Sequence, residues 1–415
     1  MLASPCVLPP TQASEEESFD APIAADPLNA KVLLLGSRDE SCKSYSEVSF
    51  YLSTDGGSAW NRAECMPAFS RGTREYVAVD EPSVGYDLKG KAYVSGLYSD
   101  GEGQAVVGVQ KSSDGSNWGS PVVALRELGG YPGETHLAVD ASASSPRAGA
   151  VYVSGIVETK YTQVLVSHST DGGSTWTSAA VDTPQKRPEQ DFLTRMAVAK
   201  DGAVYVTWIR CSSTCHAGYI AISKSTDGGN TWSSPQQIAR VRTAPDGLPH
   251  TYERVYNYPS IAADNSDGPY AGNLYVVMYT WTGSYLKVQV IRSTDGGNTW
   301  SQPVRLTPKS DTHDQFFPAI SVSPTGRVGV SWLDRRNDPN DIDYQAFAAF
   351  SDDGGQRFGT NWQLTTAFSD PETGTDGWMG DYTGNTWVGD KFIAAWMDTS
   401  NGEYILDVVG GVRLK

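Results

Sequence analysis

One ten-residue segment, Asp334–Asp343, holds two adjacent arginines among four aspartates. The arginines are Arg335 and Arg336. A planar guanidinium can hold a carboxylate or a sulfate through two parallel hydrogen bonds, so this segment could bind an acidic group. The same residues could instead pair with one another in a rigid surface loop, because structural ion-pair networks have the same composition. We slightly favour the paired loop and keep both arginines as candidate ligands.

Acidic residues also recur just before segments that have the character of β-strands. They are Asp20, Asp80, Glu134, Asp191, Asp314 and Asp381. A ring of such side chains could bind Ca²⁺ or hold the hydroxyls of a sugar. For any single one we favour a second role, the capping of local backbone amides, since aspartate readily accepts hydrogen bonds from them.

Six copies of a short motif indicate which elements must position these residues. The copies are Ser53–Trp60 (STDGGSAW), Ser112–Trp118, Ser169–Trp176, Ser225–Trp232, Ser293–Trp300 and the degenerate Ser351–Phe358 (SDDGGQRF). Ser and Asp side chains stabilise turns, the glycines supply positive φ, and the aromatic residue anchors the turn on its sheet. The copies lie 56 to 68 residues apart, measured between their aspartates, and repetition at such a period indicates a repeat architecture of strands joined by hairpins.

The motif resembles the Asp box, or bacterial neuraminidase repeat, of the sialidase superfamily of β-propellers. The resemblance extends over nearly the whole chain and implies an all-β fold, a single β-propeller with Asp boxes on the third-to-fourth strand turns. Seven four-stranded blades account best for 415 residues, and six, the number in sialidases, is the alternative. We expect residues 20–415 to form the propeller, and residues 1–19 to form an N-terminal extension that could complete the last blade.

The resemblance also implies a catalytic set. Sialidases use a tyrosine nucleophile activated by a glutamate, an aspartate as acid/base, and three arginines that hold the substrate carboxylate. By loop position these roles fall to Tyr382, Glu253 and Asp80. The implied substrate ligands are Arg38, Arg254, Arg335, Arg336 and Asp381. The Arg-Ile-Pro signature of the family is absent, because the first inner strand reads FDAPI over residues 19–23.

Composition limits the partners. The net charge is −16, which argues against nucleic acid and anionic membranes, and no apolar run is long enough for a membrane span. Among five cysteines, Cys42 with Cys65 and Cys211 with Cys215 are placed to form disulfides, with Cys6 left over. The alternative, a metal site of Cys211, Cys215 and His216, lacks one ligand.

These observations favour an exported, secreted or cell-surface monomer that acts on a glycan or polysaccharide. The leading hypothesis is a sialidase-like glycoside hydrolase for an acidic glycan. Such a hydrolase requires no cofactor and no catalytic metal. We leave open whether it contains a structural Ca²⁺ ion. One alternative is a polysaccharide lyase with a tyrosine or one of His136, His250 and His313 as base. The other is a propeller that binds glycans or proteins without catalysis.

Overall fold

The structure is a computed structural model that describes residues 5–42, 46–126, 131–183, 185–186, 188–212, 215–245, 247–373 and 378–414, with only the backbone at positions 40, 63, 131 and 186. Within these ranges the chain consists of β-strands and one short 3-10 helix, η1 (Glu40–Cys42). No helix in this part is long and apolar enough to cross a membrane.

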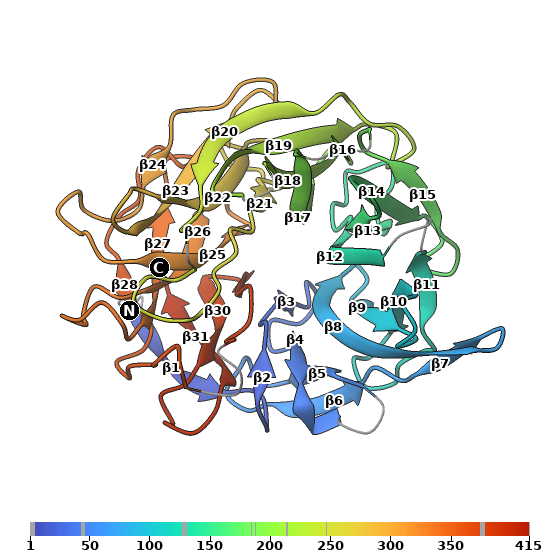
Figure 1. Cartoon of the computed structure of the whole chain (residues 1–415), viewed down its shortest axis with the longest axis horizontal. Helices are drawn as coiled ribbons and strands as arrows, with labels where there is room; N and C mark the ends of the chain where they lie inside the picture. The colour runs from blue at the N-terminus through green and yellow to red at the C-terminus, as the bar shows by residue number, and fades with distance from the viewer. Residues whose placement is uncertain are drawn as a thin grey trace.

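The strands form seven antiparallel sheets arranged as blades around a central axis (Figure 1). Blade 1 contains β2 (Ser18–Phe19), β3 (Ile23–Ala25), β4 (Leu33–Asp39), β5 (Val48–Ser53) and β6 (Asn61–Cys65). Blade 2 contains β8 (Arg74–Tyr86), β9 (Ala92–Ser99), β10 (Ala105–Ser112) and β11 (Val122–Leu125), with β7 (Phe69–Arg71) paired to β8. Blade 3 contains β12 (Tyr131–Val139), β13 (Val151–Glu158), β14 (Tyr161–Ser169) and β15 (Thr177–Ala180), with β16 (Gln185–Lys186) paired to β14.

The second half of the ring repeats this order. Blade 4 contains β17 (Gln190–Val198), β18 (Val204–Cys211), β19 (Ala217–Ser225) and β20 (Gln236–Arg242). Blade 5 contains β21 (Ser260–Ala263), β22 (Leu274–Trp281), β23 (Leu286–Ser293) and β24 (Val304–Arg305). Blade 6 contains β25 (Gln315–Val322), β26 (Val328–Asp334), β27 (Gln345–Ser351) and β28 (Trp362–Gln363). Blade 7 contains β29 (Gly384–Val388), β30 (Lys391–Asp398), β31 (Leu406–Arg413) and β1 (Cys6–Gln12).

The inner strands close the ring. Each contacts the next in the order β3, β8, β12, β17, β21, β25 and β29, and β29 returns to β3. The predicted all-β propeller with seven four-stranded blades is therefore confirmed, and the six-bladed alternative is wrong. The seventh unit forms a blade of its own because its fourth strand comes from the other end of the chain.

That fourth strand is β1, which pairs antiparallel with β31. Cys6 lies opposite Arg413 and Val7 opposite Val412. In Figure 1 β1 lies beside β31. This pairing covers the edge of β31, which would otherwise be open to intermolecular pairing.

The six motif copies form the turns between the third and fourth strands, as predicted. In blade 3 the Ser169 hydroxyl donates to Asp171 Oδ1 at 2.8 Å, and the amide of Gly173 donates to Ser169 Oγ at 2.8 Å. Asp171 Oδ1 also accepts the amide of Thr175 at 2.9 Å. The Trp176 indole closes the turn by donating to the Gly173 carbonyl at 3.3 Å. The motif is thus a scaffold element.

Gly173 has a φ of +79°, so we expect Gly173→Ala to destabilise the fold. A Cβ at this position would make only ordinary contacts, so the cost is the left-handed backbone itself, about 1–2 kcal/mol. Gly119→Ala is the matched control, because its added Cβ meets only the Lys111 carbonyl at 3.6 Å and no positive φ is involved. Urea unfolding should show a lower free energy of unfolding for Gly173→Ala only, and equal losses in both variants would contradict this account of the turn.

Buried tryptophans fix the ends of several second strands. In each case the indole N–H donates a hydrogen bond to an aspartate carboxylate. Trp208 donates to Asp191 at 2.8 Å, Trp332 to Asp334 at 2.7 Å, and Trp396 to Asp398 at 3.1 Å. A buried indole needs such an acceptor. Acids at these strand ends are therefore part of the packing.

Candidate active site at the channel mouth

The inner strands bend where they approach the axis. The strand register shifts between Asp80 and Ser83, between Gly133 and His136, between Phe192 and Arg195, and between Phe316 and Ala319. Non-glycine residues with positive φ lie in these bends, and one more lies between β2 and β3; they are Asp20, Glu81, Glu134, Leu193 and Phe317. Bulges re-aim side chains and are frequent beside functional sites. Here they turn acidic side chains towards the neighbouring blades and the channel mouth.

Glutamates in these bulges link one blade to the next. Glu81 accepts the amide of Thr135 at 2.8 Å and also that of Glu134. Glu134 in turn accepts the amide of Leu193 in blade 4. These carboxylates cap backbone amides, as expected. The capped amides belong to the neighbouring blade and not to the strand that carries the carboxylate. The acid ring thus has a structural role that joins blades.

Asp20 makes the same type of link across the junction of blades 1 and 7. Its Oδ1 accepts the amides of Asp381 at 2.6 Å and Tyr382 at 3.2 Å. Burial, followed by the charges of Asp381 and Asp80, raises the pKa of Asp20. The predicted residues Asp80, Asp381 and Tyr382 therefore meet around one buried carboxyl group.

Asp80 has the environment of a proton donor. Its pKa is raised to about 6, mainly by burial and also by the charge of Asp381, although Arg38, the Glu81 amide and Arg254 lower it. Its Oδ1 accepts the amide of Glu81 at 2.8 Å. Unlike Asp20, Asp80 keeps some contact with solvent. A half-buried carboxyl with a pKa near neutrality can exchange a proton with a bound substrate.

Two predicted arginines meet at this mouth. Arg254 holds Asp381 in a bidentate ion pair, with Nε at 3.0 Å from Oδ1 and Nη2 at 2.6 Å from Oδ2. The guanidinium carbons of Arg254 and Arg38 lie 4.7 Å and 4.6 Å from the ring centre of Trp378. The Trp378 indole also donates to Asp381 Oδ1, at 3.3 Å. Trp378 therefore contacts two cations and one carboxylate that come from strand β4 and from two blade connections.

A third arginine, Arg195, was missed by the sequence analysis. Its guanidinium carbon lies 4.0 Å from the ring centre of Tyr258 and 4.5 Å from that of Tyr382. All three side chains are largely buried, and Arg195 and Tyr382 line a cavity of about 150 Å³ in the central channel. No local sequence signal marked it, because its place depends on the bulge between Phe192 and Arg195 inside β17.

The predicted Tyr382–Glu253 pair is not joined by a hydrogen bond. The Tyr382 hydroxyl donates to the Pro82 carbonyl at 2.8 Å, and burial raises its pKa well above the usual value. Glu253 Oε2 accepts the amide of Met379 at 3.1 Å, and Oε1 has no partner among the described residues. Burial raises the pKa of Glu253 to about 7. In this arrangement Glu253 is not positioned to activate the tyrosine.

Arg335 and Arg336, the other two predicted ligands, form ion pairs with Asp314 and Asp334. Arg335 is fully buried and its Nη1 donates to the Pro249 carbonyl at 2.7 Å and to Asp314 Oδ2 at 3.3 Å. Arg336 Nε donates to Asp334 Oδ1 at 2.9 Å. Arg336 therefore pairs within the segment, whereas the partners of Arg335 lie outside it, and Nε and Nη2 of Arg335 have no partner among the described residues.

The three histidines considered for a lyase do not gather at one place in the described chain. His136 lies in the channel, where burial lowers its pKa, and its Nδ1 lies 3.3 Å from the amide of Met196. His313 Nδ1 lies 3.1 Å from Asp311. His250 has a positive φ in the loop before blade 5.

A groove continues from the mouth along the junction of blades 4 and 5. It encloses about 350 Å³, and its wall includes Glu134, Phe192, His216, Arg254 and Tyr256. Burial raises the pKa of Glu134 to about 8. Tyr256 is 42 % exposed, and the guanidinium carbon of Arg254 lies 5.0 Å from its ring centre. Aromatic faces beside polar side chains suit sugar rings.

The predicted disulfides are confirmed. Cys42 is bonded to Cys65, and Cys211 to Cys215, while Cys6 is free and exposed. The bond between Cys211 and Cys215 leaves no thiolates there for a metal. Within the described residues no group of three or more His, Cys, Asp and Glu side chains is arranged to hold a metal ion.

Comparison with known proteins supports the fold. The sequence matches no family model and no curated protein. A Dyadobacter fermentans protein of unknown function is similar in structure, with 16% identity, a TM-score of 0.51 and coverage of 84% of this chain and 97% of its own. The intramolecular trans-sialidase of Ruminococcus gnavus has 12% identity, a TM-score of 0.50 and coverage of 79% and 91%. An α-L-arabinofuranosidase of Fusarium graminearum has 12% identity, a TM-score of 0.50 and coverage of 83% and 98%.

At these identities the similarity establishes the architecture. The chain is a β-propeller of the kind that these sialidases and arabinofuranosidases also adopt.

Proposed function

We propose that this protein is an exported glycoside hydrolase of sialidase-like type that acts on an acidic glycan at the channel mouth. One observation carries the proposal. Asp80, a carboxyl group with a raised pKa, lies close enough to Asp381, Arg38 and Arg254 for their charges to change that pKa, and Arg254 holds Asp381 in an ion pair. Glycoside hydrolysis needs a proton donor and a second carboxylate or an equivalent nucleophile, and an acidic sugar needs cationic ligands.

In this proposal Asp80 donates the proton to the leaving oxygen, and Arg38 and Arg254 bind the acidic group of the substrate. Asp381 supplies the second carboxylate, held in place by Arg254 and Trp378. The Tyr382 hydroxyl already donates a hydrogen bond to the Pro82 carbonyl, so in this proposal Tyr382 is part of the wall of the site and not the nucleophile. The groove lined by Tyr256 receives the remainder of the glycan.

A substrate screen tests the proposal. Sialosides and uronate-containing oligosaccharides are incubated with the wild type, with Asp80→Asn and with Asp267→Asn, a fully exposed surface control. Release of a reducing sugar by the wild type and by Asp267→Asn, but not by Asp80→Asn, is expected. Binding without turnover would favour the non-catalytic alternative, and an unsaturated product would favour a lyase.

The pH dependence should follow Asp80. Its pKa is raised from 3.8 to about 6, so the carboxyl is protonated below that pH and loses its proton above it. We therefore expect kcat/KM to fall as the pH rises through about 6. Arg38 lowers this pKa, so Arg38→Gln should shift the falling limb to higher pH. A limb that stays in place in Arg38→Gln would show that another group controls the rate.

A further inference from the structure

The segment that follows β1 lies between the last blade and the first, and Asp407 of β31 holds it. The amide of Ala13 donates to the Asp407 carbonyl at 2.8 Å. The amide of Asp407 donates to Ser14 Oγ at 2.8 Å and to Ser18 Oγ at 2.9 Å. The backbone of Asp407 is thus satisfied by the N-terminal segment.

The side chain of Asp407 is not satisfied. Asp407 is fully buried, and neither of its carboxylate oxygens has a hydrogen-bond partner in the described part of the chain. Ser18 Oγ lies 2.9 Å from the amide of Asp407, and Ser18 is paired with Asp39 across β2 and β4. Burial and the charge of Asp39 raise the pKa of Asp407, while the Ser37 and Ser18 hydroxyls lower it as weak donors whose geometry falls short of a full hydrogen bond. A buried carboxylate without partners is costly, so a group that satisfies it is expected.

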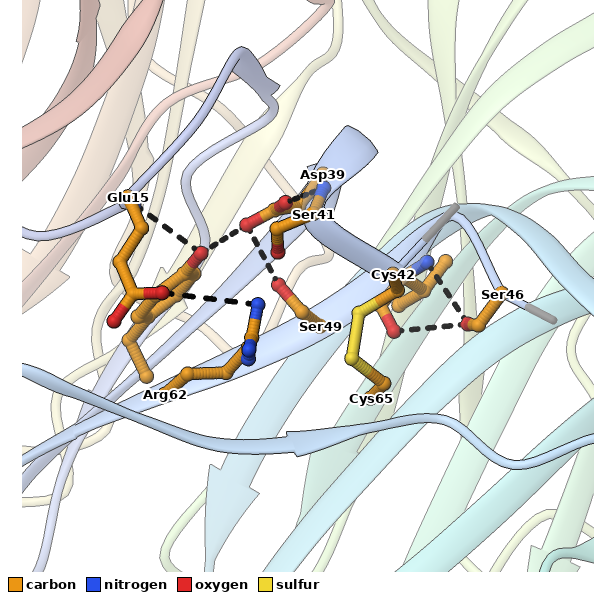
Figure 2. Close-up of a disulfide and its surroundings, with 10 residues drawn as sticks. Glu15, Asp39, Ser41, Cys42, Ser46, Ser49, Arg62 and Cys65 are labelled. Carbon is orange, nitrogen blue, oxygen red and sulfur yellow. Dashed lines mark hydrogen bonds and ion pairs between the residues drawn. A yellow bond between two sulfur atoms is a disulfide. The ribbon is translucent and has the colours of Figure 1, made fainter. Parts of the chain in front are cut away.

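The second carboxylate, Asp39, ends β4 in blade 1 and lies next to the disulfide between Cys42 and Cys65 (Figure 2). It is buried, and it accepts the Ser49 hydroxyl at 3.0 Å, the amide of Ser41 at 2.5 Å and the Tyr51 hydroxyl. A carboxylate has about four acceptor sites, so Asp39 retains capacity for another partner.

No described cation compensates this pair. Neither Asp39 nor Asp407 forms a salt bridge with a lysine, arginine or histidine of the described residues. Among the described residues the cluster therefore combines two carboxylates with several hydroxyl oxygens. These are the ligands of a hard cation.

We propose that Asp39 and Asp407 bind a Ca²⁺ ion, with the hydroxyl oxygens of Ser18 and Ser37 as further ligands. A divalent ion balances the two carboxylates, which a monovalent ion would leave with a net negative charge. Ca²⁺ suits the place better than Mg²⁺, because Mg²⁺ usually keeps several bound waters and this cluster is buried.

The ion would join three parts of the chain, namely the N-terminal segment at Ser18, blade 1 at Asp39 and blade 7 at Asp407. Those parts meet where the ring closes. A bound ion would therefore stabilise the closure of the propeller.

Terbium luminescence and thermal unfolding test this site. Tb³⁺ replaces Ca²⁺ and is excited by nearby aromatic rings, and the Tyr51 hydroxyl bonds directly to Asp39. In the wild type we expect a Tb³⁺ signal that Ca²⁺ displaces, and a Tm about 3 to 5 °C higher with saturating Ca²⁺ than with a chelator. Asp407→Asn should lose both effects, whereas Asp267→Asn should keep them.

Two results would overturn the proposal. One is a wild-type Tm that Ca²⁺ does not change, which would leave a protonated Asp407 as the explanation of the buried pair. The other is an Asp407→Asn variant that keeps the displaceable Tb³⁺ signal. If Asp407→Asn does not fold, the milder Ser18→Ala variant should show weaker Tb³⁺ binding than the wild type, and unchanged binding would contradict the site.

Discussion

Asp80→Asn is expected to lower kcat/KM on an acidic glycan by about 100- to 10,000-fold, the range that general acid catalysis contributes. The amide has nearly the shape of the carboxyl but cannot donate its proton to a leaving oxygen. Its effect should depend on the leaving group. Aryl glycosides with a strongly acidic phenol need little protonation, so their cleavage should be lowered much less. Steady-state kinetics on both substrate types measures the difference.

The matched comparison for this variant is Tyr382→Phe. The hydroxyl of Tyr382 donates to the Pro82 carbonyl at 2.8 Å, so its removal costs a hydrogen bond of the wall and no catalytic group in our proposal. We expect kcat to change little. An equal loss in Tyr382→Phe and Asp80→Asn on every leaving group would instead support the tyrosine nucleophile of sialidases.

Arg254→Ala is expected to raise KM by about 10- to 100-fold for acidic substrates, the value of a hydrogen bond to a charged group. The change removes a ligand of the acidic group and leaves Asp381 without its bidentate partner. Neutral analogues of the same substrate should lose less. KM for charged and neutral substrates, measured side by side, separates loss of charge recognition from general damage.

Two further variants sharpen this test. Arg254→Lys keeps the charge but not the planar fork, so it should recover only part of the affinity. Arg327→Ala removes an arginine that pairs with Asp352, away from the mouth, and should leave KM unchanged. Equal effects of Arg254→Ala on charged and neutral substrates would contradict the assigned role.

The fold was predictable from sequence because the repeated turn has a local cause. Serine, aspartate and glycine satisfy and shape each turn within a few residues, as around Asp171, and their period follows the blades. The seventh blade was harder, since it has no motif and its last strand comes from the N-terminus.

The site was predictable only in part, because it depends on where bulged strands aim their side chains. Position along the chain brought Asp80, Asp381, Arg38 and Arg254 into one candidate set, and the structure does place them together. Arg195 was missed since its contacts with two tyrosine rings arise from a bulge that no local signal marks.

The segment Asp334–Asp343 of blade 6 shows a limit of predictions made from composition. Two adjacent arginines suggested an anion site, yet Nη1 of Arg335 donates to Asp314 and to the Pro249 carbonyl of the connection between blades 4 and 5. Composition alone does not show where the partners of a guanidinium lie, inside its own segment or in a neighbouring one.

The most direct test of the central claim is hydrolysis in water enriched in heavy oxygen, with mass spectrometry of the sugar released from an acidic oligosaccharide. If the channel mouth hydrolyses a glycosidic bond, the label enters the anomeric hydroxyl with the wild type, and product is nearly absent with Asp80→Asn. An unlabelled, unsaturated sugar, or equal labelled product from both proteins, would contradict the account.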